Sequence, residues 1–250
     1  MSLALEINNL TFKYAEQSKN CLENISLQVK TGERFGLFGP NGAGKTSLMH
    51  LMTGLISFNE GSIKLLGNEL KHKDKSINSL FGFVPQDFSF YQELSPVENL
   101  AFFGAWCGLS KPEIKERTEE LLQTLNLTEV RNKSVAKFSG GMKRRVNLAI
   151  GVINKPAILF LDEPTVGVDI QTRHAIIDYL KELNKNGTTL FYTSHQLHEA
   201  ESLCTKIALV DDGKLIACDT LNNLLIQHNA VNLEELFLTL TGKAYRDCDV

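Results

Sequence analysis

Residues 35–47 read F-G-L-F-G-P-N-G-A-G-K-T-S, an apolar run that leads directly into a glycine-rich loop. The loop holds the spacing G-x-x-x-x-G-K-T, in which Lys45 precedes Thr46. Backbone N–H groups can surround a polyphosphate where glycines leave out the Cβ, and a following helix points its positive end at the phosphates. The alternative is a glycine-rich turn that binds nothing. Because the loop lies between a strand-like run and a helix-like run, it favours phosphate binding within an α/β fold.

Composition excludes several other classes of function. The 250 residues are 43% hydrophobic, enough for a large core, and the net charge of −3 argues against a broad nucleic-acid surface. The five cysteines are dispersed without metal-ligand spacing, which is typical of reduced thiols. No apolar stretch approaches the roughly 18–20 residues that span a bilayer. The first ten residues carry an acid and no basic region, unlike a signal peptide. We therefore expect any membrane role to come through a partner.

Two partly alternating apolar runs, 3–14 and 21–30, predict a β-hairpin or meander before the nucleotide strand. The composition changes at about Asp87, and residues 87–154 are predicted to be mostly helical. Within this stretch Ser95-Pro96-Val97-Glu98 has the pattern of a helix N-terminus, and Ser110-Lys111-Pro112-Glu113 repeats it. The sequence therefore predicts a helical insertion between strands of an α/β core.

Two features inside the insertion have competing interpretations. Trp106 and Cys107 are interpreted as core residues, not as parts of a site. The stretch 138–153 can be a helix with Ser139 as its N-cap and Lys143, Arg144 and Arg145 on a solvated face. It can also be a second anion site built like the first, since Gly140 and Gly141 leave the first turn uncovered.

Polar side chains follow three predicted strands at the point where each strand ends. The apolar run 157–161 ends in Asp162 and Glu163, while Gln86 and His195 follow two other runs. Ligands of open α/β sheets bind at the carboxyl ends of strands. A lone Gln or His there is usually an ordinary loop residue. Two carboxylates after a buried strand need a cation or water, so Asp162 is the expected Mg²⁺ acid and Glu163 the candidate base.

The order of these motifs resembles that of the ATP-binding cassette (ABC) ATPases over residues 3–242. The signature Ser139-Gly140-Gly141 lies 23 residues before Asp162 (162 − 139), which separates this family from other P-loop proteins. The resemblance implies an α/β fold with a P-loop NTPase (RecA-like) core, an antiparallel β subdomain and an inserted α-helical subdomain. It implies one ABC ATPase domain over 1–242, with its core at 1–86 and 155–220, the helical subdomain at 87–154 and a helical tail at 221–250.

The resemblance also implies ATP and Mg²⁺ as cofactors and a role for each motif. Tyr14 would stack on adenine, and the phosphates would be wrapped by the loop residues Gly39, Pro40, Asn41, Gly42, Ala43, Gly44, Lys45, Thr46 and Ser47. Thr46, Gln86 and Asp162 would serve Mg²⁺. Glu163 would polarise the attacking water, with His195, Gln86 and Lys45 completing the catalytic set. Asp169 would lie at the subunit interface, where Ser139, Gly140, Gly141 and Met142 would cap the ATP of the opposite subunit.

A second nucleotide-binding subunit, as a homodimer or a paired chain, and integral-membrane permease subunits are therefore implied as partners, and no nucleic acid is expected. The chain would be cytoplasmic, held on the cytoplasmic face of the membrane by a permease that docks near Gln86 and the insertion. The form S-G-G-M-K-R-R and the tail at 232–242 are similar to the drug-, ion- and polysaccharide-exporting branch. The alternative is a soluble ATP-gated interaction module. One cassette, no basic tail and only 53 residues between Gln86 and Ser139 (139 − 86) argue against it.

Overall fold

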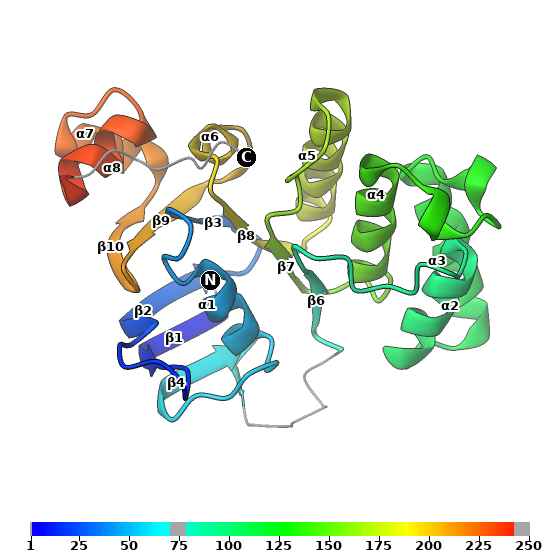
Figure 1. Ribbon diagram of the computed structural model, residues 1–250, viewed down its shortest axis with the longest axis horizontal. Helices are drawn as coiled ribbons and strands as arrows, with labels where there is room; N and C mark the ends of the chain where they lie inside the picture. The colour runs from blue at the N-terminus through cyan, green and yellow to red at the C-terminus, as the bar shows by residue number, and fades with distance from the viewer. Residues whose placement is uncertain (1, 71–78, 243–250) are drawn as a thin grey trace. The chain divides into compact units, whose positions relative to one another are not determined.

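The computed structural model describes residues 2–70 and 79–242 of the chain (Figure 1). It divides into two compact units, one formed by residues 1–77 with 189–250 and the other by residues 78–188. The end of the predicted tail, residues 243–250, lies outside the described residues. Each unit is described by itself, and the subdomain boundaries predicted from the sequence stay a prediction.

The first unit contains an antiparallel sheet in the order β2-β1-β4-β5. Its strands are β1 (Leu3–Phe12), β2 (Leu22–Lys30), β4 (Glu60–Leu65) and β5 (Asn68–Glu69). In β1, Ile7 is buried and lies opposite Leu27 of β2 and Ile63 of β4. The alternation of buried and exposed residues along β2 is that of a sheet covered on one face. The predicted antiparallel β subdomain is confirmed.

The same unit contains parallel strands around the nucleotide loop. Strand β3 (Arg34–Phe38) lies between β8 (Thr189–Ser194) and β9 (Lys206–Asp211), parallel to both, and β10 (Lys214–Asp219) forms a hairpin with β9. Phe35 stacks on Phe191 with ring centroids 5.3 Å apart, which fixes the register of β3 against β8. The parallel strands β3, β8 and β9 are buried almost throughout, as expected for a parallel sheet, while β10 at the edge is not.

Four helices accompany the strands in the described part of the first unit. They are α1 (Lys45–Met52), α6 (Leu197–Leu203), α7 (Leu221–His228) and α8 (Leu233–Thr241), and α7 and α8 lie together in Figure 1. Helix α1 ends at Met52, and Leu55 beyond its end is exposed.

The second unit combines two parallel strands with a group of helices. Strand β6 (Phe81–Val84) pairs with β7 (Ile158–Asp162), and the helices are α2 (Pro96–Trp106), α3 (Lys111–Thr124), α4 (Gly140–Gly151) and α5 (Ile170–Lys185). Two 3₁₀ turns, η2 (Thr128–Val130) and η3 (Val135–Lys137), lead from α3 to α4. A Cβ on Gly82 would lie 1.9 Å from the carbonyl oxygen of Gly151, so this glycine lets the end of α4 pack directly on β6.

The N-terminal signatures predicted in the insertion are confirmed. Ser95 accepts from the Glu98 backbone while Glu98 accepts from Ser95, and Ser110 donates likewise to Glu113. The prediction that Trp106 is a core residue is wrong, because it lies on the outer side of the last turn of α2 and is 74% exposed. Helix α5 was not predicted.

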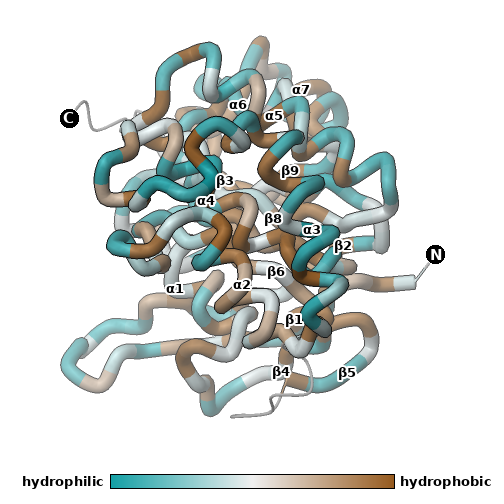
Figure 2. Tube along the Cα trace, turned by 90° about the vertical axis from the view of Figure 1, so that its right-hand side faces the viewer, coloured by the Kyte–Doolittle hydropathy of each residue, from teal (hydrophilic) through white to brown (hydrophobic). Residues whose placement is uncertain are grey.

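Among the described residues, no helix is both long and apolar enough to cross a bilayer. Figure 2 shows the hydropathy of each residue along the chain trace, and hydrophilic and hydrophobic residues alternate within the helices.

Candidate active site

The glycine-rich loop connects β3 to α1, and its lysine is turned back onto the loop. The buried Lys45 ammonium donates to the carbonyl oxygens of Gly39 at 2.8 Å and Pro40 at 3.2 Å. A Cβ on Gly39 would lie 2.1 Å from the carbonyl oxygen of Val210, so glycine is required there by the approach of β9. Helix α1 starts at Lys45 without a side-chain cap, and its first N–H groups are thus suited to an anion.

Tyr14 lies beside the first turn of α1. Its hydroxyl is 3.0 Å from the Ser47 hydroxyl, which also accepts from the Cys21 thiol at 3.2 Å. The Tyr14 ring packs edge-on against Phe12 with centroids 4.8 Å apart. The structure therefore brings Tyr14 to the nucleotide loop, while its stacking on adenine stays a prediction. Sequence reasoning missed the Cys21 contact, because this residue lies in a turn with no motif.

His195 follows β8 on a turn that a buried carboxylate holds in place. Glu199 accepts from the hydroxyls of Tyr192 and Ser194, both at 2.6 Å. Ser194 in turn accepts from the backbone N–H of Gln196 at 2.9 Å, so the half-buried His195 lies between two anchored residues. Sequence reasoning missed Glu199. Its position four residues after His195, on the short helix α6, was the available signal.

In the second unit, β7 delivers both acids to its carboxyl end. Asp162 is 1% exposed and Glu163 is 5% exposed. The Gln86 side chain amide donates to the Glu163 carboxylate at 3.1 Å, so two residues predicted from separate strand ends are in contact. Glu163 has φ 47°, in the left-handed region that a non-glycine residue adopts only at a cost.

These residues fit a Mg²⁺ ion held in part by a substrate. No cluster of three or more His, Cys, Asp and Glu side chains occurs among the described residues. Mg²⁺ is usually held by one or two carboxylates together with substrate phosphates and waters. A single buried carboxylate such as Asp162 at a strand end matches that need. The Gln86 amide donates to Glu163 through its nitrogen, and its oxygen can serve as a further metal or water ligand.

Arg144, on the second turn of α4, is 4% exposed and bridges separate loops. Its guanidinium donates to the carbonyl oxygens of Gln86 at 2.8 Å, Pro85 at 3.5 Å and Val166 at 3.2 Å. Its central carbon lies 4.8 Å from the centroid of the Phe88 ring. The interpretation of Arg144 as part of a solvated face is therefore wrong, since the face of α4 that carries it packs on β6.

The charge of Arg144 is separated from the nearest acids. Burial lowers the pKa of the guanidinium, and the negative charges of Asp87 and Glu163 oppose that shift. The Nε atom of Arg144 is buried without a hydrogen-bond partner. The group is thus held by carbonyl dipoles and a ring rather than by a carboxylate contact.

The signature residues begin α4, and Asp169 begins α5. Ser139 accepts from the Met142 backbone N–H at 3.3 Å, and Asp169 accepts from the Thr172 backbone and hydroxyl at 2.8 Å each. The two Thr172 bonds lower the pKa of the Asp169 carboxyl. A Cβ on Gly141 would lie 3.2 Å from the Thr172 hydroxyl, so the two helix starts lie side by side.

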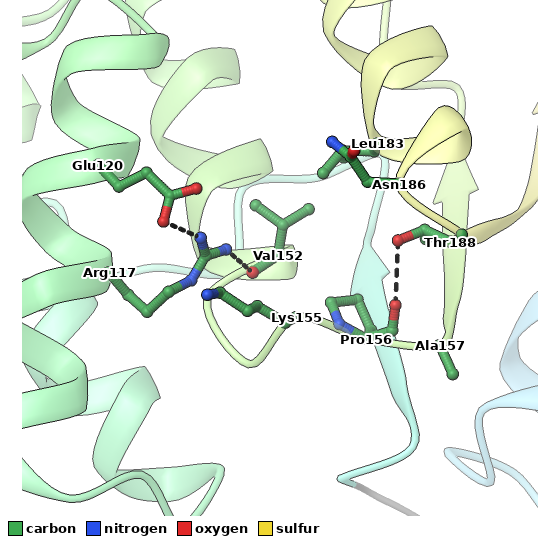
Figure 3. A pocket seen from close by; sticks show the side chains of 10 residues that line it. Arg117, Glu120, Val152, Lys155, Pro156, Ala157, Leu183, Asn186 and Thr188 are labelled. Carbon is green, nitrogen blue, oxygen red and sulfur yellow. Dashed lines mark hydrogen bonds and ion pairs between the residues drawn. The ribbon is translucent and has the colours of Figure 1, made fainter.

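A pocket of about 440 Å³ lies at the other end of β7 and contains none of the predicted site residues (Figure 3). Arg117, on its wall, donates to the carbonyl oxygens of Val152 at 2.8 Å and Ile153 at 3.2 Å and pairs with Glu120. Thr188 donates to the Pro156 carbonyl at 3.2 Å. Arg117, Glu120 and Thr188 on the wall of this pocket therefore have partners within the protein.

Parallel strands with the loop G-x-x-x-x-G-K-T between β3 and α1 define a P-loop nucleotide-binding protein. A family model described as ABC transporter matches residues 22–166. The chain is 38% identical over 242 residues to the linearmycin resistance ATP-binding protein LnrL of Bacillus subtilis (strain 168), covering 94% of this chain and 77% of that protein. The chain belongs to the ABC transporter family, as an ATP-binding subunit and ATPase.

Further relatives and solved structures agree. The doxorubicin resistance ATP-binding protein DrrA of Mycobacterium tuberculosis (strain CDC 1551 / Oshkosh) is 33% identical, with 99% of this chain and 73% of that protein covered. The structure of an ATP-binding subunit of an ABC transporter superposes with a TM-score of 0.87 at 30% identity, covering 95% and 99% of the two chains. A dimeric post-hydrolysis cassette bound to ADP and Pi has a TM-score of 0.79 at 26% identity, covering 86% and 98%.

Proposed function

We propose that this chain hydrolyses ATP to energise an exporter whose membrane-spanning part is a separate subunit. The relatives named for linearmycin and doxorubicin resistance and for Nod factor export support this direction of transport. They also favour transport over the alternative of a soluble ATP-gated module. The chain would be held on the cytoplasmic face of the membrane through its permease.

The observation that carries the catalytic proposal is the 3.1 Å hydrogen bond from Gln86 to Glu163. A carboxylate oriented by an amide is placed to take a proton from water, whose oxygen then attacks the γ-phosphorus as the bond to the ADP oxygen breaks. Mg²⁺, with Asp162 as a ligand, would supply charge stabilisation for the phosphates. Thr46 as a further metal ligand, and Lys45 and His195 as γ-phosphate contacts, are proposed from the family motif.

The same proposal includes a second subunit. Ser139, Gly140, Gly141 and Met142 at the start of α4 would cap the ATP bound by the partner, and Asp169 would face the interface. The two adjacent helix starts of α4 and α5 support an anion-binding role for this surface. The partner is a second copy of this chain or a paired subunit.

The permease is proposed to dock near Gln86 and the helical insertion. An aromatic patch, formed by Tyr91, Phe102 and Trp106, is exposed on and beside α2. Phe102 and Trp106 are four positions apart and lie on one face of the helix, and Tyr91 contacts Phe102 with ring centroids 5.0 Å apart. An exposed cluster of large apolar side chains is typical of a protein contact surface.

The variant Glu163→Gln tests the catalytic proposal. An amide keeps the shape of the side chain but accepts no proton, so we expect ATP binding within about twofold of wild type and turnover lower by about 10³-fold. The variant should form an ATP-dependent dimer in light scattering, because the nucleotide is not consumed. Wild-type hydrolysis by Glu163→Gln would remove Glu163 as the base.

The variant Ser139→Arg tests the role of the signature in the opposite site. We expect turnover to be lost while ATP binding to the monomer is unchanged, measured by equilibrium binding of a fluorescent ATP analogue. Ser110→Arg is the matched control, because Ser110 is also a helix N-terminal serine of the same unit and should leave turnover intact. A Ser139→Arg monomer unable to bind ATP would show that the signature serves its own chain.

A further inference from the structure

Three main-chain carbonyls from two loops converge on the guanidinium of Arg144. We propose that Arg144 is a positioning residue for ATP hydrolysis, which sets where the Gln86 amide meets the Glu163 carboxylate. The inference rests on the proposed function, in which Glu163 accepts the proton of the attacking water. It assigns to Arg144 a role that neither its residue type nor its place in a run of three basic residues indicates.

The first half of the argument concerns Gln86. Its carbonyl oxygen accepts from Arg144 at 2.8 Å, while its side chain donates to Glu163 at 3.1 Å. Asn147, one turn further along α4, donates to the Pro85 carbonyl at 3.0 Å, so helix α4 holds this loop at two successive residues. The backbone from which the Gln86 side chain extends toward the carboxylate is therefore held on α4.

The second half concerns Glu163. The turn after β7 closes through the backbone bond from Val166 to the Glu163 carbonyl at 3.3 Å, and the Val166 carbonyl accepts from Arg144 at 3.2 Å. Glu163 has left-handed backbone angles inside this turn. Both partners of the Gln86–Glu163 hydrogen bond are therefore tied to the same guanidinium, one through its own carbonyl and one through its turn.

Only an arginine suits this position. The planar guanidinium donates from two separate nitrogens, Nη1 toward the Pro85 and Gln86 carbonyls and Nη2 toward the Val166 carbonyl, while a lysine has one nitrogen from which to donate. The Phe88 ring covers one face of the group at 4.8 Å. The contacts of the guanidinium with two separate loops fit a role in geometry.

The matched experiment compares Arg144→Met with Arg117→Met in the purified full chain. Both arginines are buried in the same unit and donate to main-chain carbonyls, but the sequence neighbours Val152 and Ile153, with Glu120, are the polar partners of Arg117 among the described residues. We expect Arg144→Met to lower kcat by about 10- to 100-fold, because small misplacements of reacting groups have effects of this size. KM and the Kd for ATP should stay within about twofold, and Arg117→Met should keep wild-type kcat.

A double-mutant cycle with Gln86→Ala distinguishes positioning from general loss of structure. If Arg144 acts through Gln86, the double variant should be far less impaired than the product of the two single effects. The proposal would be overturned if the effects of Arg144→Met and Gln86→Ala on kcat multiplied in the double variant. It would also be overturned if Arg144→Met kept wild-type kcat, or if Arg144→Met and Arg117→Met changed kcat and KM equally.

Arg144→Lys covers the case in which Arg144→Met does not fold. It keeps the charge and most of the volume, and we expect a loss of about 3- to 10-fold in kcat with unchanged melting temperature. Full activity of Arg144→Lys would overturn the need for a bridging guanidinium. Failure of the proposed function is distinguished from failure of the Arg144 proposal by two other results. These are a wild-type chain that does not hydrolyse ATP and a Glu163→Gln variant that retains turnover.

Discussion

The two ends of β7 resemble each other in their backbone. Glu163 follows the carboxyl end, and Lys155 lies two residues before the amino end. Both residues have left-handed backbone angles, φ 47° for Glu163 and φ 49° for Lys155. Each end also has one buried arginine that donates to main-chain carbonyls, Arg144 at the carboxyl end and Arg117 at the amino end. The two ends thus share a left-handed residue and a buried arginine bound to main-chain carbonyls.

The partners of the arginines distinguish the two ends. Arg117 is 6% exposed and joins successive carbonyls just after α4 to an acid on its own helix, so it closes one helix end. Arg144 joins the loop after β6 to the turn after β7. The first segment contains Gln86, which donates to Glu163, and the second contains Glu163 itself. The comparison separates an arginine whose acceptors lie in two segments that carry proposed site residues from one whose acceptors are two adjacent residues.

The largest difference between the ends is expected for Glu163→Gly. Loss of the base should lower turnover by about 10³-fold, while relief of the left-handed angle should raise the stability of the fold by about 0.5–1 kcal/mol. Hydrolysis assays and thermal melting measure the two effects together. A variant that lost both turnover and stability would show that Glu163 serves the fold, as the amino end does.

A second large effect is expected for Asp162→Asn at the same end. Turnover should fall by about 10²-fold, because the metal loses a charged ligand, and more Mg²⁺ should restore part of it. Titration of Mg²⁺ in the hydrolysis assay makes the measurement, and a loss that no Mg²⁺ concentration changes would argue against a metal role.

Arg117→Met should have its effect on stability alone. The change removes the Arg117 donor from the Ile153 carbonyl and one of two donors from the Val152 carbonyl, which also accepts from the Lys155 backbone N–H at 3.1 Å. We therefore expect a loss of about 1–3 kcal/mol, or roughly 3–10 °C in melting temperature. The turnover measured below the transition should equal that of wild type. Reduced kcat in this variant would mean that the two ends of β7 are coupled, and the comparison would fail.

The smallest effect is expected for Lys155→Gly. This residue adopts its left-handed angle in the turn before β7, where a glycine has no steric cost, so stability should rise by about 0.5–1 kcal/mol. Turnover should not change, in contrast to Glu163→Gly. Chemical denaturation of the two variants side by side makes the comparison, and destabilisation by Lys155→Gly would show that the Lys155 side chain has a packing role.

Local patterns carried most of what the sequence predicted. The capping boxes at Ser95 and Ser110, the glycine-rich loop and the acids after β7 depend on neighbouring residues, so spacing alone indicated them. Helix α5 was not predicted, although its buried residues Ile176, Ile177 and Leu180 recur at helical spacing. The sequence also placed Gln86 and Glu163 at two strand ends, and their contact followed from the parallel pairing of β6 with β7.

What the sequence could not predict depends on which helix face is covered. Lys143, Arg144 and Arg145 look alike in the sequence, and Arg144 is buried because the contact of Gly82 with Gly151 sets α4 against β6. Trp106 is misleading for the converse reason, since its size suggests burial while the end of α2 leaves it uncovered. Both outcomes are tertiary, and no local pattern encodes them.

The ammonium of Lys45 has two carbonyl oxygens of its own loop as neighbours, those of Gly39 and Pro40. In the proposed function, the arrival of a triphosphate at this nitrogen would be a substitution of one set of oxygens by another. An anion with several closely spaced negative oxygens would be favoured in that competition, because it can replace both carbonyl dipoles together.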